Sequence, residues 1–339
     1  MNNSVSSVDP AWGTVGAARA VAAAWVRDHA RSLPGYAGAY VTGSAAGRPD
    51  GAALPATSDL DVKVVTDAPG GPGKFRHGGV LLDVSHVPLP APAAALASYH
   101  LAPSLRAGAI LDDPRGELRA LHAAVAAGFA ATRGLRRDDA LATIERHLAG
   151  AAADRPWAVR VQAWLFGTGV TAHAALAAAG RNPTIRTRYA AAREVLTAPE
   201  YAALLRLLDG GDPGADRVRA HLAALAPVFD ATAEALRAGP PAAPLPFLAD
   251  LTAAARPVAI DGSRELVDAG LHREAMFWIA VTFARCAQAG GGAAGPALAA
   301  CLADLGIRSA GDLAARVAAV RAFLPRLRAI TDDILKTSC

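Results

Sequence analysis

Three aspartates in the N-terminal third of the chain have the residue type and spacing of a divalent-cation site. Asp59 and Asp61 stand at alternate positions where residues 60–66 predict a short β-strand, and alternate side chains of a strand point the same way. Two carboxylates about 7 Å apart on one strand repel each other unless a cation lies between them. Asp83 is the one acid in a second predicted strand, 80–87, and completes the cluster if the two strands are neighbours. Because Mg²⁺ prefers carboxylate oxygens, these acids predict a magnesium site, with two ions about 3.5–4 Å apart.

A glycine–serine pair precedes the acids and predicts contacts to phosphate. Residues 39–42 predict a strand that leads directly into Gly43 and Ser44. Glycine lets backbone N–H groups come close to a phosphate, and the serine hydroxyl adds a donor. Ser58, beside the acids, and Lys63, on the same strand face, are the other predicted contacts to a phosphate-bearing ligand.

These motifs together resemble the signature of the DNA-polymerase-β-like nucleotidyltransferase superfamily, which combines a Gly-Ser turn, an Asp-x-Asp strand and an acid on a later strand. The matching residues are Tyr40-Val41-Thr42-Gly43-Ser44, Ser58-Asp59-Leu60-Asp61-Val62 and Asp83. The layout is most similar to that of the antibiotic (aminoglycoside-type) nucleotidyltransferases, in which a helical domain follows the catalytic one. The resemblance covers residues 35–90. The loop 45–57 makes the spacing between the first two motifs longer than is usual in the family.

The resemblance implies a reaction and a role for each residue. A hydroxyl of the acceptor would attack the α-phosphorus of a nucleoside triphosphate and release pyrophosphate, with two Mg²⁺ ions at the acids. Asp59 and Asp61 would bind both ions and Asp83 the catalytic one, while Gly43 and Ser44 would hold the β- and γ-phosphates. The expected acceptor is a small molecule, an antibiotic or a metabolite. The alternatives are a non-catalytic nucleotide-binding or partner-binding module, and a toxin that nucleotidylates a protein or RNA target.

The remaining sequence predicts an α+β protein in two parts. Up to residue 115 a helix at 17–30 is mixed with short β-branched runs and with Gly/Pro-rich loops at 45–57 and 68–79. Beyond residue 115, alanine- and leucine-rich segments predict helices. We expect a small mixed-sheet nucleotidyltransferase domain, 1–115, and an α-helical bundle domain, 116–339, with the nucleotide and acceptor in the cleft between them. The helices expected in the second part are 116–132, 138–152, 156–178, 183–197, 199–209, 214–238, 262–288, 295–304 and 310–335.

One basic segment of the second part is a candidate triphosphate clamp. Asn182 suits the cap, and Pro183 the first position, of the predicted helix 183–197. Arg186 and Arg188 follow, and the planar fork of arginine suits phosphate oxygens. The simpler interpretation is a solvated basic helix start.

Two other sets of charged residues are candidates for the acceptor side. Arg264, Asp268 and His272 recur every four residues, so they share one face of the predicted helix 262–288. Glu145 is the nearest candidate for a general base from the helical part, although Asp83 can also take the acceptor's proton. Exposed ion pairs and a surface glutamate are the alternatives for these sets.

Composition bears on whether the protein crosses a membrane, is secreted or binds nucleic acid. Hydrophobic residues make up 53% of the chain, but no run reaches the roughly 18–20 apolar residues of a membrane-spanning helix. The first ten residues have no basic segment followed by an apolar one, so no signal peptide is expected. The net charge of +4 is too small to favour a nucleic-acid partner. Cys286, Cys301 and Cys339 have no paired spacing, which indicates a reducing, cytoplasmic location. The oligomeric state stays open.

Overall fold

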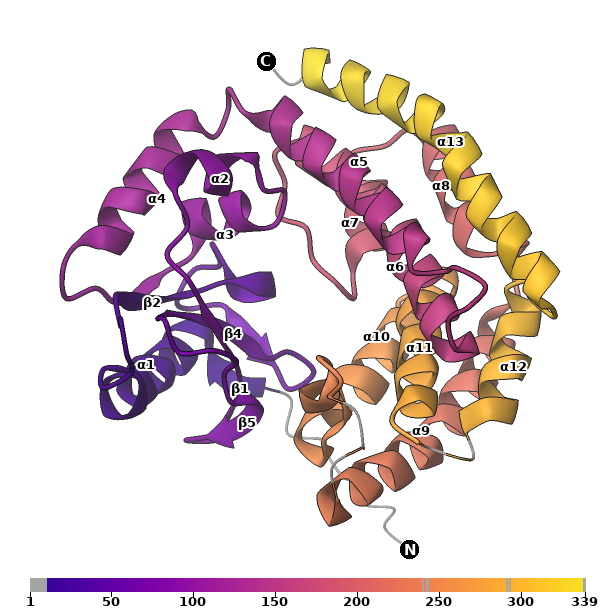
Figure 1. Cartoon of the computed structure of the whole chain (residues 1–339), viewed down its shortest axis with the longest axis horizontal. Helices are drawn as coiled ribbons and strands as arrows, with labels where there is room; N and C mark the ends of the chain where they lie inside the picture. Colours follow the sequence, from indigo (N-terminus) through magenta and orange to yellow (C-terminus); the bar gives the residue numbers. More distant parts are fainter. Residues whose placement is uncertain (1–10, 240, 242–243, 291, 293, 338–339) are drawn as a thin grey trace, which may run out of the picture.

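The chain folds into a mixed α+β structure with a small sheet and many helices, as expected from the sequence (Figure 1). The computed structural model describes residues 11–239, 241, 244–290, 292 and 294–337. The first ten residues and Cys339 therefore lie outside the described residues.

Within the described residues the main sheet has five strands in the order β5-β6-β4-β2-β7. Strands β4 and β6 are parallel, and the other neighbouring pairs are antiparallel. The strands are β2 (Gly38–Val41), β4 (Leu60–Val65), β5 (Gly73–His77), β6 (Val80–Val87) and β7 (Ile110–Asp112). The predicted strands at 39–42, 60–66, 80–87 and 109–111 are thus confirmed within one residue at each end.

The two faces of the sheet have different neighbours. Helix α1 (Val15–Trp25), continued by a π-helical turn (Val26–Ala30), packs on one face, where it meets fully buried Leu60, Val62 and Val64. The opposite face packs in part against α3 and α4 through a second apolar cluster. The rest of that face carries polar residues toward the helices of the C-terminal half. The helices near the sheet are α2 (Pro92–Ala97), α3 (Leu101–Ala107) and α4 (Glu117–Gly128).

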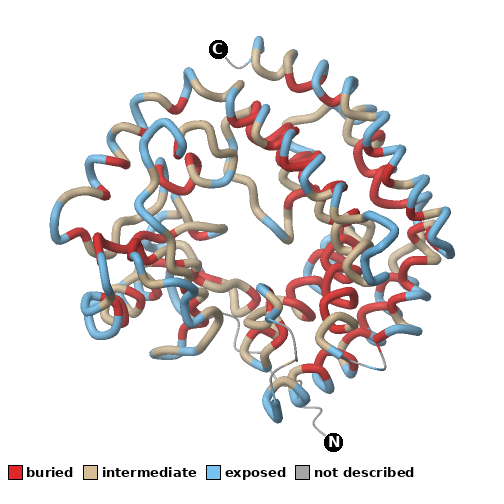
Figure 2. Tube along the Cα trace, in the orientation of Figure 1, coloured by how far each residue is buried: buried red, intermediate tan, exposed pale blue. Residues whose placement is uncertain are grey.

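The C-terminal half is built around α6 (Trp157–Ala178) and α11 (His272–Gln288), whose residues are mostly buried (Figure 2). A single large apolar cluster joins them to their neighbours because alanine faces let the helices pack closely. The other helices are α5 (Arg133–Ala149), α7 (Arg188–Arg193), α8 (Ala198–Leu208), α9 (Ala215–Ala238), α10 (Gly262–Asp268), α12 (Ala294–Asp304) and α13 (Ala310–Thr337). Among the described helices, none combines the length and apolar character needed to cross a membrane.

Two predicted loops contain short strands. In the segment 45–57, β3 (Ala53–Pro55) pairs with β1 (Ala11–Thr14). In the segment 68–79, β5 forms a hairpin with β6 through Gly78 and Gly79, both with positive φ. That backbone is the one a tight two-residue hairpin turn requires, and adjacent glycines favour it.

Two predicted helices are also wrong in part. The helix expected at 262–288 is divided between α10 and α11 by Gly270, whose φ is +77°. The backbone N–H of Leu271 donates to Leu266 O at 2.8 Å, the bond that closes a left-handed glycine stop. The helix expected at 183–197 is reduced to α7, and residues before Arg188 are extended or in turns.

Candidate active site

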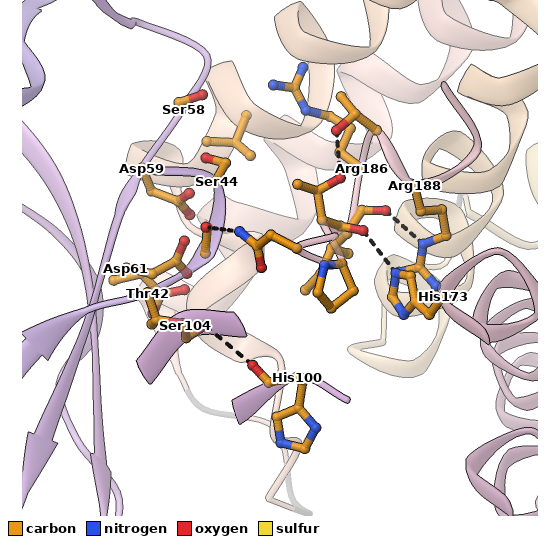
Figure 3. Close-up of a pocket in the computed structure, with 18 of the residues that line it drawn as sticks. Thr42, Ser44, Ser58, Asp59, Asp61, His100, Ser104, His173, Arg186 and Arg188 are labelled. Atoms are coloured by element: carbon orange, nitrogen blue, oxygen red, sulfur yellow. Dashed lines mark hydrogen bonds between the residues drawn. The ribbon is translucent and has the colours of Figure 1, made fainter. Parts of the chain in front are cut away.

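The three predicted acids meet at the edge of β4 and β6. Asp61 on β4 pairs in register with Asp83 on β6, and Asp59 directly precedes β4. One carboxylate oxygen from each of the three lies within 4.8 Å of the others. The parallel pairing of the strands explains this, because equal positions on neighbouring parallel strands put their side chains on the same face. Figure 3 shows Asp59 and Asp61 pointing into the cavity from the sheet.

Gly43 occupies a backbone position that the acids require. It follows β2 with φ +67° and begins the short 3₁₀ turn Gly43–Ala45. A Cβ at this position would overlap Oδ2 of Asp61. The adjacent Thr42 N–H donates to Asp61 O at 2.9 Å, and the Asn182 amide donates to Gly43 O at 2.8 Å. The turn therefore sets the position of Asp61 and ties the sheet to the C-terminal half.

Gly43→Ala is expected to damage both stability and the acid cluster. A left-handed backbone costs a non-glycine residue about 1–2 kcal/mol, and the overlap with Asp61 adds about 1–3 kcal/mol of overpacking. Gly270→Ala is the matched control, because its φ is +77° but an added Cβ meets open space. Urea unfolding with and without Mg²⁺ measures both effects. Equal losses in the two variants would mean that Gly43 matters only for its backbone.

Lys74 is a site residue that the sequence did not predict. It lies on β5 opposite Asp83, and its ammonium contacts three carboxylates, those of Asp59 at 3.0 Å, Asp83 and Asp250 at 2.7 Å. Its side chain is only 9% exposed. The carboxylate oxygens are of the ligand type that magnesium prefers. However, an ion that binds Asp59 and Asp83 on this side must displace the ammonium.

Asp250 brings a fourth carboxylate from the C-terminal half. It lies in the 3₁₀ turn Leu248–Leu251 (η3) and accepts from Arg285 Nη1 on α11 at 2.7 Å as well as from Lys74. Both cations lower the pKa of Asp250, although its burial acts in the opposite direction. Asp250 is therefore ionised at neutral pH and joins the sheet to α11 through two ion pairs.

The acid cluster carries unrelieved negative charge. Burial and the neighbouring Asp59 raise the pKa of Asp61 well above its usual range, and Lys74 and Lys63 offset this only in part. Burial alone would lower the pKa of Lys74, but Asp59, Asp250 and Asp83 outweigh it and raise that pKa. Lys74 therefore stays charged, and a divalent cation would relieve more of the repulsion than it does.

The other predicted phosphate contacts lie around the same cavity. Its volume is about 580 Å³, and Ser44, Ser58 and Lys63 line it together with the acids. This size is within the range of small-molecule sites, about 300–1,000 Å³. Residues from the sheet, from the chain before α3 and from α6, α7 and α11 form its walls.

Arg186 lines this cavity and lies between the two halves of the chain. Its Nη2 donates to Thr57 O at 3.2 Å, and its Nη1 lies 3.6 Å from Glu265. The Thr57 hydroxyl also donates to the Glu265 carboxylate at 2.8 Å. A Cβ on Gly262 would overlap the guanidinium, so glycine there leaves the space that Arg186 fills.

Arg188 lies deeper, on the wall opposite the acids (Figure 3). It is 1% exposed, and burial lowers its pKa to about 10, so the guanidinium remains charged at neutral pH. Both predicted arginines thus reach the cavity. They do so from a turn stabilised by tertiary contacts rather than from the helix expected at 183–197. Asn182 is not a helix cap, because its side chain bonds to Gly43 O.

The other predicted candidates on the helical side are not part of the cavity. Glu145 forms an exposed ion pair with Arg321 at 3.1 Å. The row on 262–288 is interrupted by the break at Gly270, and its members are engaged in exposed pairs. These pairs are Arg264 with Asp261, Asp268 with Arg219, and His272 with Asp212. Trp278 and Arg285, from the second half of that segment, line the cavity instead.

Comparison with known proteins adds no assignment to this geometry. No known protein-family model matches the chain, and no curated protein matches it.

Proposed function

We propose that this protein is a metal-dependent nucleotidyltransferase that moves a nucleoside monophosphate from a nucleoside triphosphate to a hydroxyl of a small acceptor. The observation that carries this proposal is the cluster of Asp59, Asp61 and Asp83, with oxygens within 4.8 Å, beside the glycine turn at Gly43. Carboxylates gathered on neighbouring strands at the floor of a cavity are a costly arrangement without a cation. Two Mg²⁺ ions are the proposed cofactor.

In this proposal the acids bind the metal ions, and other residues of the cavity bind the phosphates. Magnesium bound there would polarise the phosphates and lower the pKa of the attacking hydroxyl. Asp59 and Asp61 would hold the ions, and Asp83 would hold the catalytic one and accept the hydroxyl proton. The acceptor oxygen forms a bond to the α-phosphorus as the bond to the β-phosphate oxygen breaks, which releases pyrophosphate. Gly43, Ser44 and Ser58 hold the phosphates, with Lys63 and Arg186 supplying positive charge.

The division of the chain follows from this proposal. Residues 1–115 form the catalytic domain, and residues 116–339 form the helical domain that closes the nucleotide and acceptor cleft. Asn182, Arg186 and Asp250 support this division, since each contacts the sheet side from the helical side. Cys286 and Cys301 are buried free thiols, which supports a reducing, cytoplasmic location.

Lys74 favours a second candidate, a nucleotide-binding module without catalysis. Its ammonium lies against Asp59 and Asp83 and supplies a monovalent cation where the first candidate needs magnesium. If Lys74 never leaves the acids, the protein binds a nucleotide but transfers nothing. Pyrophosphate release in the presence of Mg²⁺ separates the two candidates.

Calorimetric titration of a non-hydrolysable ATP analogue, followed by the GTP, CTP and UTP analogues, tests the proposed site. Binding is expected with Mg²⁺ and is expected to disappear with a chelator or in Asp59→Asn/Asp61→Asn. The control is Asp216→Asn/Asp230→Asn, which removes the same charge from exposed positions on α9. If no triphosphate binds at millimolar concentration, or if the double asparagine variant binds normally, the proposal is wrong.

A further inference from the structure

The inner end of the cavity contains a buried cation without a counter-ion. Arg188 is 1% exposed, its Nε donates to Ile185 O at 2.7 Å, and its guanidinium lies 4.1 Å from the ring centroid of Phe277. Its Nη1 has no hydrogen-bond partner within the described part of the chain, and no carboxylate there forms an ion pair with it. A buried charge in this state is costly unless a ligand completes it.

Arg136 shows how the same chain satisfies a buried arginine that is purely structural. It is 0% exposed and stacks on Phe129 at 3.9 Å, much as Arg188 stacks on Phe277. Both terminal nitrogens of Arg136 have acceptors, with Nη2 donating to Phe129 O at 2.7 Å and Nη1 to Thr132 Oγ1 at 2.8 Å, and its Nε has no partner among the described residues. Arg136 does not line the cavity, whereas Arg188 does. The two arginines thus differ at the terminal nitrogens, since Nη1 of Arg188 lacks an acceptor and only Arg188 lines the cavity.

Two more residues of the same wall contain a buried donor without a partner. Nε1 of Trp278 and Nε of Arg285 have no hydrogen-bond partner in the described ranges, and these residues are 8% and 9% exposed. Arg188 and Arg285 lie 5.8 and 5.7 Å from the ring centroid of Phe166, so the two guanidinium groups flank one ring. Tryptophan and arginine nitrogens donate hydrogen bonds and cannot accept them. This wall therefore suits oxygen acceptors, and above all anionic ones.

The positive charge of this wall exceeds what its acid can balance. Arg285 is paired with Asp250, but Asp250 also pairs with Lys74. The wall thus has two guanidinium groups, those of Arg188 and Arg285, and one carboxylate, which also pairs with Lys74.

A histidine beside these donors supplies an acceptor. His173 is 4% exposed, and its Nε2 donates to Thr184 O at 2.9 Å, since a carbonyl oxygen can only accept. Its Nδ1 has no partner in the described part of the chain and carries a lone pair in the neutral ring. Figure 3 shows His173 next to Arg188, across the cavity from Asp59 and Asp61. A ligand hydroxyl suits this nitrogen.

Helix α6 is shaped to leave the guanidinium in place. A Cβ on Gly169 would overlap Nη1 of Arg188 and come within 2.8 Å of the Phe277 ring. Glycine weakens a helix interior relative to alanine. Its presence here fits a wall that leaves room for Arg188.

We propose that this wall, formed by Arg188, Trp278, Arg285 and His173, binds the acidic group of the acceptor, so that the acceptor is a hydroxyl compound carrying a carboxylate or a phosphate. That this ligand is the acceptor rests on the proposed function, nucleotidyl transfer. The cationic wall disfavours polyamine acceptors such as aminoglycosides, because it would place like charges together.

Matched ligands that differ in a single group test the proposal by calorimetry on the whole chain. One series is D-glucuronate, D-glucose and D-glucosamine, and the other is 4-hydroxybenzoate, 4-hydroxybenzamide and 4-hydroxybenzylamine. D-glucose 6-phosphate distinguishes a phosphate from a carboxylate. At least one acid is expected to bind about tenfold or more tightly than its neutral and cationic partners, because charge-assisted hydrogen bonds are the strong ones.

Arg188→Gln is expected to weaken binding of that acid by about tenfold or more. Trp278→Phe, which keeps the ring and removes one donor, is expected to weaken it by a smaller factor. Arg136→Gln removes a buried guanidinium outside the cavity and controls for a general loss of stability. The ATP analogue is expected to bind Trp278→Phe and Arg136→Gln as it binds the unchanged protein, and to lose less affinity than the acid does in Arg188→Gln.

The outcomes also separate this inference from the proposed function. Acid binding that survives in Asp59→Asn/Asp61→Asn, while nucleotide binding is lost, supports an independent anion subsite. If no acid in the panel binds, or if an amine binds as tightly as its matched acid, the inference is overturned. It is also overturned if Arg188→Gln weakens the ATP analogue as much as the acid, because the guanidinium then belongs to the nucleotide subsite. A failure to bind any triphosphate, with acid binding intact, would overturn only the proposed function.

Discussion

Asp59→Asn/Asp61→Asn is expected to reduce magnesium-dependent pyrophosphate release by a factor on the order of 10³ or more. One oxygen of each carboxylate lies within 4.8 Å of Asp83, and asparagine keeps the side-chain shape while removing the negative charge that would hold a cation. The measurement is pyrophosphate release from each triphosphate with a pool of hydroxylated acceptors. Each single variant is expected to lose nearly as much as the double variant, because ligands of one metal site act as a unit.

The exposed pair Asp216→Asn/Asp230→Asn provides the comparison for this rate, since it changes the net charge equally without touching the cavity. A loss in this control would indicate a long-range charge effect. Release that continues unchanged in Asp59→Asn/Asp61→Asn would remove these aspartates from the reaction. If the unchanged protein releases no pyrophosphate but binds triphosphate, the non-catalytic module becomes the better description.

Lys74→Met is expected to lower the free energy of unfolding of the metal-free protein by about 3–5 kcal/mol, the usual cost of removing one partner from a buried ionic group. Lys74 contacts Asp59, Asp83 and Asp250 and is only 9% exposed, so its loss leaves these carboxylates facing one another. If magnesium binds the acids as proposed, it takes over this role, and millimolar Mg²⁺ is expected to restore much of the lost stability. Urea unfolding with and without Mg²⁺ measures both effects.

The pH dependence of the stability lost in Lys74→Met tests whether repulsion between the carboxylates causes the loss. The pKa of Asp61 is already raised when Lys74 is present, and removal of the lysine raises it further. A carboxyl with a raised folded-state pKa destabilises the fold only when it is ionised, so the loss is expected to shrink as the pH falls through that pKa. Lys336→Met is the control, because this lysine forms an exposed pair with Asp333. If the loss of stability in Lys74→Met does not depend on pH or magnesium, it comes from lost packing of the side chain and not from its charge.

The sheet and its acids could be predicted because their patterns are local. Strand β4 alternates buried Leu60 and Val62 with Asp61, and this alternation alone assigns the face of each side chain. Strand β6 is a short apolar run interrupted by Asp83, and its pairing with β4 brings the acids together. The structure confirms this proximity, whereas the metal and the reaction remain predictions.

Lys74 was missed because its strand has no apolar alternation. The five residues of β5 include glycine, lysine, arginine and histidine, and their place in the sheet comes from pairing with β6. One signal could have revealed it. Gly78-Gly79 is a typical two-residue hairpin turn, and a hairpin at that point puts Lys74 opposite Asp83.

The helical side of the cavity could not be predicted for a different reason. Asp250 is a single acid in a short 3₁₀ turn, and no local pattern shows that it lies beside Lys74. The segment before Arg188 begins with residues that favour a helix start. However, the Asn182 amide donates to Gly43 O, and the Thr184 carbonyl accepts from His173. These tertiary contacts outweigh the local preference for a helix. A periodic row at Arg264 and Asp268 indicated one face of a helix, but not whether that face was exposed.

The contacts that join the two halves of the chain have a consequence for its synthesis. Gly43 O is bonded to Asn182, 139 residues later, and Thr57 to Glu265, 208 residues later. A ribosome that has released only the sheet has made every acid of the cluster but neither of these partners. At synthesis rates of about 5–20 residues per second, the acids therefore wait on the order of ten seconds for them. During that interval Lys74, which is part of the same sheet, is the cation nearest to the acids, and a dissolved divalent cation would neutralise them further.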